Sequence, residues 1–282
     1  MKILKIKEGI KQIAPRQYAG RDDIDELVIA DTVEEIGEGA FRECPNLKKI
    51  TWGSGIHTIG VQAFYKCESL KLLQLPNSVR RVGSRSFASC PSLVYVEFED
   101  GENVEIEDEV FTDCNGLVCA ILPSGLNHIQ RGTFFGCPKL EDIFIPGSVT
   151  RIGWGAFCGV AAEEIELPDS IELIYQSAFC TSKLTSIVVP DSVFEIHHYA
   201  FERCYDLKSV DIGNSVVSIG MHAFEDCTAL TEVTFRSTII GSIGVSIFKG
   251  CKNLKRINVP AGAMDTYKRL LPKYLHRKLV GF

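Results

Sequence analysis

Eleven cysteines and six histidines are the side chains of this 282-residue sequence with the most obvious capacity for chemistry. Cysteines could form disulfides, hold a metal ion or act as nucleophiles. A zinc site usually takes its ligands as close pairs in sequence, and no C-x-x-C pair occurs. Nor does any H-E-x-x-H, P-loop, G-x-S-x-G or G-x-G-x-x-G motif. We therefore predict no metal, no cofactor and no catalytic residues. The alternative is an enzyme whose catalytic carboxylates come from different parts of the chain and converge in the fold.

The cysteines follow a fixed spacing, which points to an element that recurs along the chain. Eight of them each stand three residues after a phenylalanine, and two more phenylalanines continue the series without a cysteine at that position. The spacing between successive phenylalanines is 22 to 24 residues. The series runs through Phe41, Phe64, Phe87, Phe111, Phe134, Phe157, Phe179, Phe201, Phe224 and Phe248. A period of 20 to 50 residues is typical of solenoids, propellers and other arrays.

Further residues keep fixed offsets from this phenylalanine. Leu lies at offset six, apolar pairs at nine and eleven, proline often at twelve, and Val or Ile followed by Ile at fifteen and eighteen, as in Leu140, Ile143, Ile145, Pro146, Val149 and Ile152. The N-terminal segment around Tyr18 fits as a degenerate first unit, so we count eleven units. A glycine often stands at offset nineteen, but Glu107, Gln130, Tyr175 and His197 replace it. Since Tyr and Glu rarely adopt a positive φ, this glycine is interpreted as easing close packing.

The pattern of one unit predicts a short strand in every turn of a solenoid. The segment L-x-x-I-x-I-P alternates with period two, which is typical of a strand, and proline ends its hydrogen-bond ladder. With one strand in about 23 residues, successive strands must lie side by side in a parallel sheet. No unit buries its apolar side alone, so stability comes from stacking. A propeller blade needs about 40 residues, and no helical period of 3.6 is present.

The position of the eight cysteines inside such a unit decides among their three roles. Stacked units place like residues about 5 Å apart, close enough for contact, but each cysteine is flanked by apolar neighbours. We therefore interpret them as small buried hydrophobic residues, not as disulfides or metal ligands. Free thiols favour a reducing compartment or an anaerobic setting.

The sequence resembles the leucine-rich-repeat superfamily, and more closely its BspA-like bacterial branch. The runs that carry the resemblance are LKLLQLPNSVRRVGSRSFASC (70–90) and LEDIFIPGSVTRIGWGAF (140–157), and it extends over about residues 3–260. Pro-Asx-Ser replaces the Asn ladder of the wider superfamily, as at 76–78. The resemblance implies a curved solenoid with a parallel sheet on the concave face, short strands and turns on the convex face, no enzymatic activity, and binding or adhesion, often at bacterial surfaces.

Two parts of the chain depart from the repeat. Residues 264–282 break the period, and Tyr267, Leu270, Leu271, Tyr274 and Leu275 recur at helical spacing. We predict a solenoid over residues 1–263 and a C-terminal capping helix over 264–282, because a repeat array needs a polar cap; a basic helix that binds a partner or a membrane surface is the alternative. A charged insertion at 99–104 is either neutral variation in a surface loop or part of a binding rim.

Composition limits the classes of partner and the compartment. A formal charge of −6 and a pI of about 5.6 disfavour nucleic acid. No apolar run is long enough to span a membrane. The N-terminus, MKILKIKEGIKQIAPRQ, has no signal-peptide pattern. The expectation is a cytoplasmic monomer; a bacterial cell-surface protein whose signal was trimmed is the alternative.

The side chains at offsets eight and ten should point out of the coil on the concave face. Between the third and sixth rows these positions are apolar and are bordered by acidic residues, the arrangement expected of a protein-binding surface. The predicted binding residues are Leu72, Tyr95, Glu97, Val118, Ile121, Asp142, Phe144, Glu164 and Glu166. The alternative is that these residues merely favour strands. We therefore predict non-catalytic recognition of a protein or peptide. A glycan is the alternative ligand.

Overall fold

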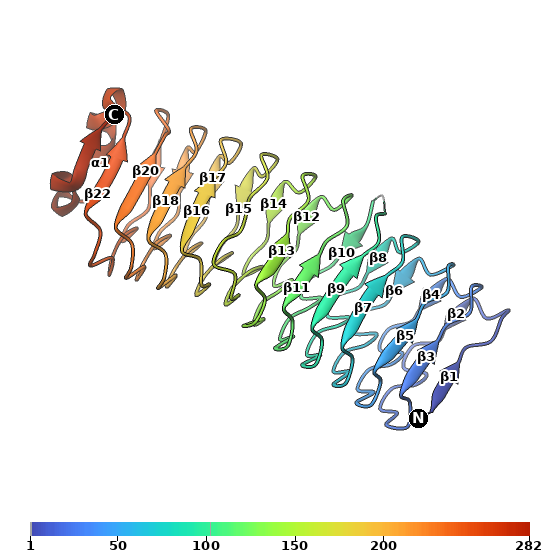
Figure 1. The fold of residues 1–282 in the computed structure, drawn as a ribbon. Coiled ribbons are helices and arrows are strands. Elements are labelled where there is room, and N and C mark those ends of the chain that lie inside the picture. Colours follow the sequence, from blue (N-terminus) through green and yellow to red (C-terminus); the bar gives the residue numbers. More distant parts are fainter. Residues whose placement is uncertain (1, 102) are drawn as a thin grey trace. The chain divides into compact units, whose positions relative to one another are not determined.

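The fold repeats one short parallel strand per turn, as the sequence predicts. A computed structural model describes residues 2–101 and 103–282. The chain divides into two compact units, residues 1–148 and 149–282. In both units the chain forms stacked turns, and each turn carries up to two strands that pair with the equivalent strands of neighbouring turns (Figure 1). The predicted parallel-strand solenoid is confirmed.

The first unit has two rows of strands. The row that follows the Leu at offset six contains β1 (Ile3–Lys5), β3 (Glu26–Val28), β5 (Lys49–Thr51), β7 (Leu72–Leu75), β9 (Tyr95–Phe98), β11 (Cys119–Ile121) and β13 (Asp142–Phe144). The second row contains two-residue strands, namely β2 (Gln12–Ile13), β4 (Glu35–Ile36), β6 (Thr58–Ile59), β8 (Arg81–Val82), β10 (Glu105–Ile106) and β12 (His128–Ile129). In the first row β1, β3 and β5 form one ladder, and β7, β9, β11 and β13 form another.

The second unit repeats the two rows. The two-residue strands are β14 (Arg151–Ile152), β15 (Leu173–Ile174), β17 (Glu195–Ile196), β19 (Ser218–Ile219) and β21 (Ser242–Ile243). The other row is β16 (Ser186–Val189), β18 (Ser209–Ile212), β20 (Glu232–Phe235), β22 (Arg256–Val259) and β23 (Leu279–Gly281). All pairs are parallel, and in-register partners such as Ile187 and Val210 put equivalent residues of successive units opposite one another.

Phenylalanine rings fill the interior of both units as stacked columns. In the first unit Tyr18 and the phenylalanines from Phe41 to Phe134 stack with ring centroids 5.2–5.9 Å apart. In the second unit the column runs from Phe157 to Phe248 with spacings of 5.1–5.7 Å. Every one of these phenylalanines is buried. The core predicted from the period is confirmed, and each ring depends on its neighbours for burial.

The eight repeated cysteines are free, buried thiols, and they do more than fill space. Each thiol lies 3.0–3.4 Å from the carbonyl oxygen of the residue at offset zero in the preceding unit, and donates to it. The acceptors are Tyr18, Phe41, Phe64, Phe87, Phe111, Phe179, Phe201 and Phe224. A small apolar residue would leave these carbonyl groups without the thiol donor. This explains why cysteine, and not alanine, recurs at the position.

Two residues of each turn adopt a left-handed backbone, two positions before and two after the stacked ring. Before the ring these are Arg16, Gly39, Gln62, Arg85, Glu109, Gly132, Gly155, Ser177, Tyr199, His222 and Ser246; after it they are Gly20, Glu43, Lys66, Ser89, Asp113, Gly136, Gly159, Thr181, Arg203, Asp226 and Gly250. Most of them are not glycine, so sequence reasoning could not locate this turn. The glycine at offset nineteen instead has an ordinary φ: a Cβ on Gly60 would lie 2.8 Å from the nitrogen of Glu38, so the interpretation as close packing is confirmed.

The C-terminal segment closes the last turn of the second unit. It forms the 3-10 helix η1 (Ala261–Ala263), the helix α1 (Met264–Leu270), the 3-10 helix η2 (Lys273–Lys278) and β23, which pairs with β22. Tyr267 is fully buried and its hydroxyl donates to the carbonyl oxygen of Ser237 at 2.9 Å. The predicted helix is thus present over part of 264–282, and a strand that was not predicted extends the sheet.

Candidate binding face

The outward side chains of β7, β9, β11 and β13 form a continuous surface of the first unit, here called the sheet face. The parallel register places Leu72 beside Tyr95, Tyr95 beside Cys119 and Cys119 beside Asp142. A second line of neighbours joins Gln74, Glu97, Ile121 and Phe144. Figure 1 shows these four strands side by side. Six of the nine residues predicted from the sequence are therefore brought together on these strands.

Exposure differs across the sheet face. Leu72 is 62% exposed and Phe144 is 64% exposed, while Tyr95 and Ile121 between them are half-buried. Val118, also predicted, lies just before β11 and is half-buried. The alternating inward residues, such as Leu73 and Val96, are buried, as period two requires. The face therefore has two exposed apolar ends and a half-buried apolar centre.

Carboxylates border this apolar surface and shape its electrostatics. Glu97 accepts a hydrogen bond from the side-chain amide of Gln74 at 3.1 Å. Partial burial and the hydrogen bond with Glu97 raise the pKa of the Tyr95 phenol, which stays neutral at physiological pH. Asp142 lies opposite Cys119, and desolvation, followed by the charges of Asp142 and Glu97, raises the pKa of that thiol. The sheet face is thus apolar in its centre and anionic at Glu97 and Asp142.

Glu164 and Glu166 lie in the second unit, where the expected strand is absent. Residues 161–168 form no strand, although Ile165 and Leu167 are buried and the two glutamates are exposed, so the alternation persists. Three glutamates at 163, 164 and 166, in a repeat shortened to 22 residues, accompany the loss of the strand. The two side chains line a pocket of about 490 Å³ with Asp169 and Val188.

Cys119 is the one free thiol of the described residues that is not buried. We expect it to react first with iodoacetamide, while the eight repeated thiols react only after denaturation. Its reaction at pH 8 should be slower than that of free cysteine, because its raised pKa lowers the thiolate fraction. Intact-mass analysis over time checks this: Cys119→Ser should remove the early single adduct. Rapid addition of several adducts to the native protein would contradict the buried arrangement.

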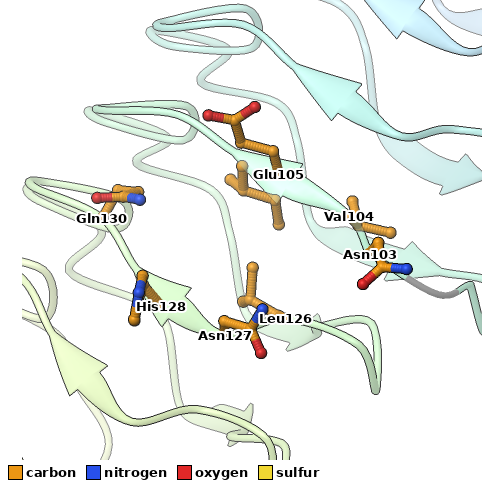
Figure 2. A pocket seen from close by; sticks show the side chains of 8 residues that line it. Asn103, Val104, Glu105, Leu126, Asn127, His128 and Gln130 are labelled. Carbon is orange, nitrogen blue, oxygen red and sulfur yellow. The ribbon is translucent and has the colours of Figure 1, made fainter.

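The insertion at 99–104 lies beside a small pocket of the first unit. Glu102 is outside the described residues, and the rest of the insertion precedes β10. The pocket has a volume of about 240 Å³ and opens between β10 and β12, where Glu105 and His128 come from neighbouring turns (Figure 2). These strands carry the second row, so the pocket does not belong to the sheet face. The part of the insertion at Asn103 therefore lines a different surface from the predicted binding residues.

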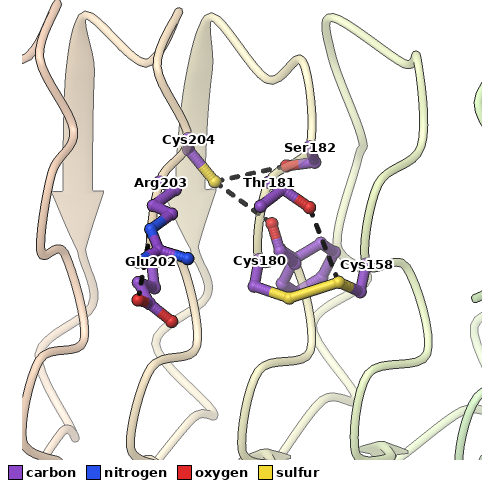
Figure 3. Close-up of a disulfide and its surroundings, with 8 residues drawn as sticks. Cys158, Cys180, Thr181, Ser182, Glu202, Arg203 and Cys204 are labelled. Atoms are coloured by element: carbon purple, nitrogen blue, oxygen red, sulfur yellow. Dashed lines mark hydrogen bonds and ion pairs between the residues drawn. A yellow bond between two sulfur atoms is a disulfide. The ribbon is translucent and has the colours of Figure 1, made fainter.

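A disulfide joins Cys158 and Cys180, which the sequence analysis did not predict (Figure 3). Their Cα atoms are 4.7 Å apart, and both residues stand one position after the stacked phenylalanine. This shared offset in adjacent units is the signal that could have identified the pair. The same two units carry Val160 and Ser182 in place of the repeated cysteine. The eight repeated cysteines are free, as predicted, but the disulfide disagrees with the reducing compartment that was inferred from them.

The described residues show neither a metal site nor a membrane-spanning helix. Among residues 2–101 and 103–282, no group of three or more His, Cys, Asp or Glu side chains is placed to hold a metal ion. Within the same part of the chain, no helix has the length and apolar character needed to cross a bilayer.

Stacked turns, parallel strand rows and a column of buried rings define a repeat protein of the leucine-rich class. The model of the family described as BspA type leucine rich repeat region matches residues 1–118, 34–162 and 155–270. The chain belongs to this family. The resemblance inferred from the repeated offsets is thereby confirmed.

Solved bacterial proteins share the fold. A leucine-rich-repeat protein from Bacteroides ovatus is 22% identical, with a TM-score of 0.52 and coverage of 99% of this chain and 92% of that chain. A leucine rich cell surface protein from Faecalibacterium prausnitzii is 24% identical, with a TM-score of 0.53 and coverage of 99% and 86%. The leucine-rich-repeat protein of T. pallidum is 27% identical, with a TM-score of 0.50 and coverage of 56% and 75%. No curated protein matches this chain.

Proposed function

We propose that this protein is a non-catalytic recognition protein that binds a protein or peptide through its sheet face. The observation that carries the proposal is the exposure of Leu72 and Phe144, at 62% and 64%, at the two ends of one four-stranded ladder. Tyr95 lies beside Leu72, Ile121 lies beside Phe144, and Cys119, on the same strand as Ile121 and beside Tyr95, connects the two pairs. Exposed apolar patches rimmed by polar residues mark interaction sites. The protein acts as a monomer in this proposal.

Strand propensity alone accounts poorly for this surface. Val, Ile, Tyr and Phe favour strands wherever they occur, but Leu72 is not a residue of that group and remains mostly exposed. The equivalent outward positions of β18 in the second unit are Ser209 and Asp211. The strand therefore forms without outward apolar side chains, and those of the sheet face are free to serve binding.

Truncation of the aromatic residues separates binding from folding. We expect Tyr95→Ala and Phe144→Ala to reduce partner binding by about 30-fold each, since an aromatic anchor contributes about 2 kcal/mol or more. The melting temperature should change little, because Phe144 is exposed and Tyr95 only half-buried. A photo-crosslinking amino acid at position 144 identifies the partner, and titration of the purified partner measures the loss.

Tyr205 supplies the matched control, because it is 51% exposed and lies in the other unit. Tyr205→Ala should leave binding unchanged. If the partner binds Tyr95→Ala and Phe144→Ala as tightly as the unchanged protein, recognition lies elsewhere. If either variant melts many degrees early, the residue belongs to the core and the assignment fails.

In this proposal the carboxylates at the border raise the rate at which the partner associates and have a smaller effect on the lifetime of the complex. Glu97 and Asp142 lie at the border of the sheet face, and Glu164 and Glu166 are exposed in the second unit. Charges at a rim steer encounter and set the salt dependence of the rate. The proposal assigns these four carboxylates to that role, with Val118 as an apolar flank. A glycan ligand is the outcome if crosslinking yields no protein.

Adhesion at a bacterial surface is the second candidate function, and the disulfide favours it. Disulfides persist in oxidising surroundings outside the cytoplasm and are rare within it. One relative of the same fold is described as a cell surface protein. The sheet face would then hold a surface ligand in the same way, so this candidate changes the compartment and not the site.

A further inference from the structure

One break interrupts the first row of strands in the first unit, the row that runs from β1 to β13. Consecutive strands of this row pair with each other in the described residues except for β5 and β7. β5 pairs with β3, and β7 pairs with β9, so each strand turns an edge without a ladder towards the other. The two turns nevertheless stay stacked, because the rings of Phe41 and Phe64 lie 5.2 Å apart and β6 pairs with β8, so the break is confined to the row that contains β5 and β7.

Trp52 is the unusual residue at this break. It follows β5 at the inward offset eleven, where the other units of the first row carry Leu, Ile or Phe. Its indole packs edge-on against Phe64 of the next unit, with ring centroids 5.8 Å apart. Gly53 meanwhile lies so close to the preceding turn that a Cβ there would be 2.2 Å from the oxygen of Ala30. The backbone after β5 thus packs closely on the preceding turn, and the indole contacts the following one.

A pocket of about 490 Å³ opens at this break. Trp52 and Leu72 contribute its apolar wall, and Leu72 also begins the sheet face. Three lysines line it, Lys48, Lys49 and Lys71, against the single carboxylate of Glu99. The pocket is therefore cationic in a protein whose formal charge is −6.

The lysines differ in how far their charge is already compensated. Lys48 pairs with Asp25 at 2.7 Å. Lys49 lies opposite Glu26 in the β3–β5 register, but neither Lys49 nor Lys71 forms an ion pair with another described residue. Glu99 accepts a hydrogen bond from the backbone nitrogen of Asn77 at 3.2 Å. Two exposed ammonium groups thus remain for an anion beside an apolar wall.

We propose that this pocket binds an acidic peptide segment of the partner, with an apolar side chain against Trp52 and an adjacent Asp or Glu carboxylate between Lys49 and Lys71. The wall of Trp52 and Leu72 favours an apolar side chain, and the two lysines without an ion pair favour a neighbouring carboxylate. The inference deepens the proposed function and rests on it, because the pocket shares Leu72 with the sheet face. It assigns the partner a negatively charged segment next to the part that covers Tyr95 and Phe144.

The two tryptophans of the chain allow a direct test on the intact protein. The probe is a blocked pentapeptide with one phenylalanine flanked by two glutamates on each side, added to 15N-labelled protein. Trp154→Phe assigns the indole N–H signal of Trp52. We expect that signal to shift saturably, with a dissociation constant that rises with salt because the attraction is screened. Replacing the glutamates by lysine, or the phenylalanine by alanine, should weaken binding at least 10-fold.

Charge reversal locates the site. Lys49→Glu combined with Lys71→Glu should weaken peptide binding at least 10-fold, while Lys208→Glu combined with Lys255→Glu, which changes the net charge equally, should not. An unshifted Trp52 signal, equal shifts with acidic and basic peptides, or saturation by a sulfated disaccharide in place of the peptide overturns the proposal. Tyr95→Ala with Phe144→Ala should still bind the pentapeptide. Peptide binding without partner binding at the sheet face therefore refutes the proposed function alone, and the reverse result refutes the pocket alone.

Discussion

Raising the pH from 8.5 to 10 is expected to lower the free energy of unfolding by an amount on the order of 8 kcal/mol, as large as the whole stability of many domains. The cause is the thiol column of the first unit. Burial raises the pKa of Cys67, Cys90, Cys114 and Cys137, and raises that of Cys44 to about 11. In the unfolded chain the same thiols ionise near pH 8.5.

The sign follows from the proton count. Above about pH 8.5 the unfolded chain releases protons that the folded chain keeps, so stability is full below that pH and falls as pH rises. Each such thiol steepens the fall towards about 1.4 kcal/mol per pH unit. Urea titrations at a series of pH values, under argon with a chelator, measure the slope. Cys90→Ala should make the slope of the free energy of unfolding against pH shallower by the contribution of one thiol. A stability that stays level up to pH 10 would show that these thiols are not held neutral by the fold.

Replacing Phe201 by alanine should lower the free energy of unfolding by about 3–5 kcal/mol, because truncation of a fully buried aromatic leaves a cavity. The ring stacks with Phe179 at 5.1 Å and with Phe224 at 5.2 Å. Each turn relies on the adjacent ones for burial, so the loss affects three consecutive turns. Denaturant titration followed by circular dichroism measures the change.

Phe248→Ala is the matched comparison at the end of the same column. Phe248 stacks with Phe224 at 5.7 Å and meets Phe235 edge-on at 6.4 Å, with no further phenylalanine of the column beyond it. We expect a smaller loss there than at Phe201. Equal and small losses at the two positions would contradict a core built by stacking.

The period alone was sufficient to predict the architecture of each turn. The alternation around Leu73 and Leu75 predicted a half-buried strand, and the repeated phenylalanine predicted the buried column. Both follow because burial repeats whenever the sequence repeats. The same alternation placed Leu72 and Phe144 outside. Their role in binding stays a prediction, since exposure shows where a side chain lies and not what covers it.

Features that depend on one unusual residue or on a contact between turns were not predicted. The break between β5 and β7 falls beside Trp52, where the other units of the first row carry Leu, Ile or Phe, and a consensus of offsets averages such a single residue away. The strand expected around Glu164 and Glu166 is absent although its inward residues are buried. An alternating pattern predicts which side chains are buried, but it does not determine whether the backbones of adjacent turns pair. The left-handed residues, such as Gln62 and Tyr199, carry no glycine signal.

The disulfide between Cys158 and Cys180 changes how the second unit comes apart. In a stack without covalent links, single turns peel away and their amide hydrogens exchange independently. Linked turns separate only together. The bonds from the Phe157 nitrogen to the Ala178 oxygen and from the Gly159 nitrogen to the Cys180 oxygen therefore belong to one opening event. After reduction the two turns can open separately. The redox state of the surroundings therefore sets the size of the smallest segment that unfolds and becomes accessible to a protease.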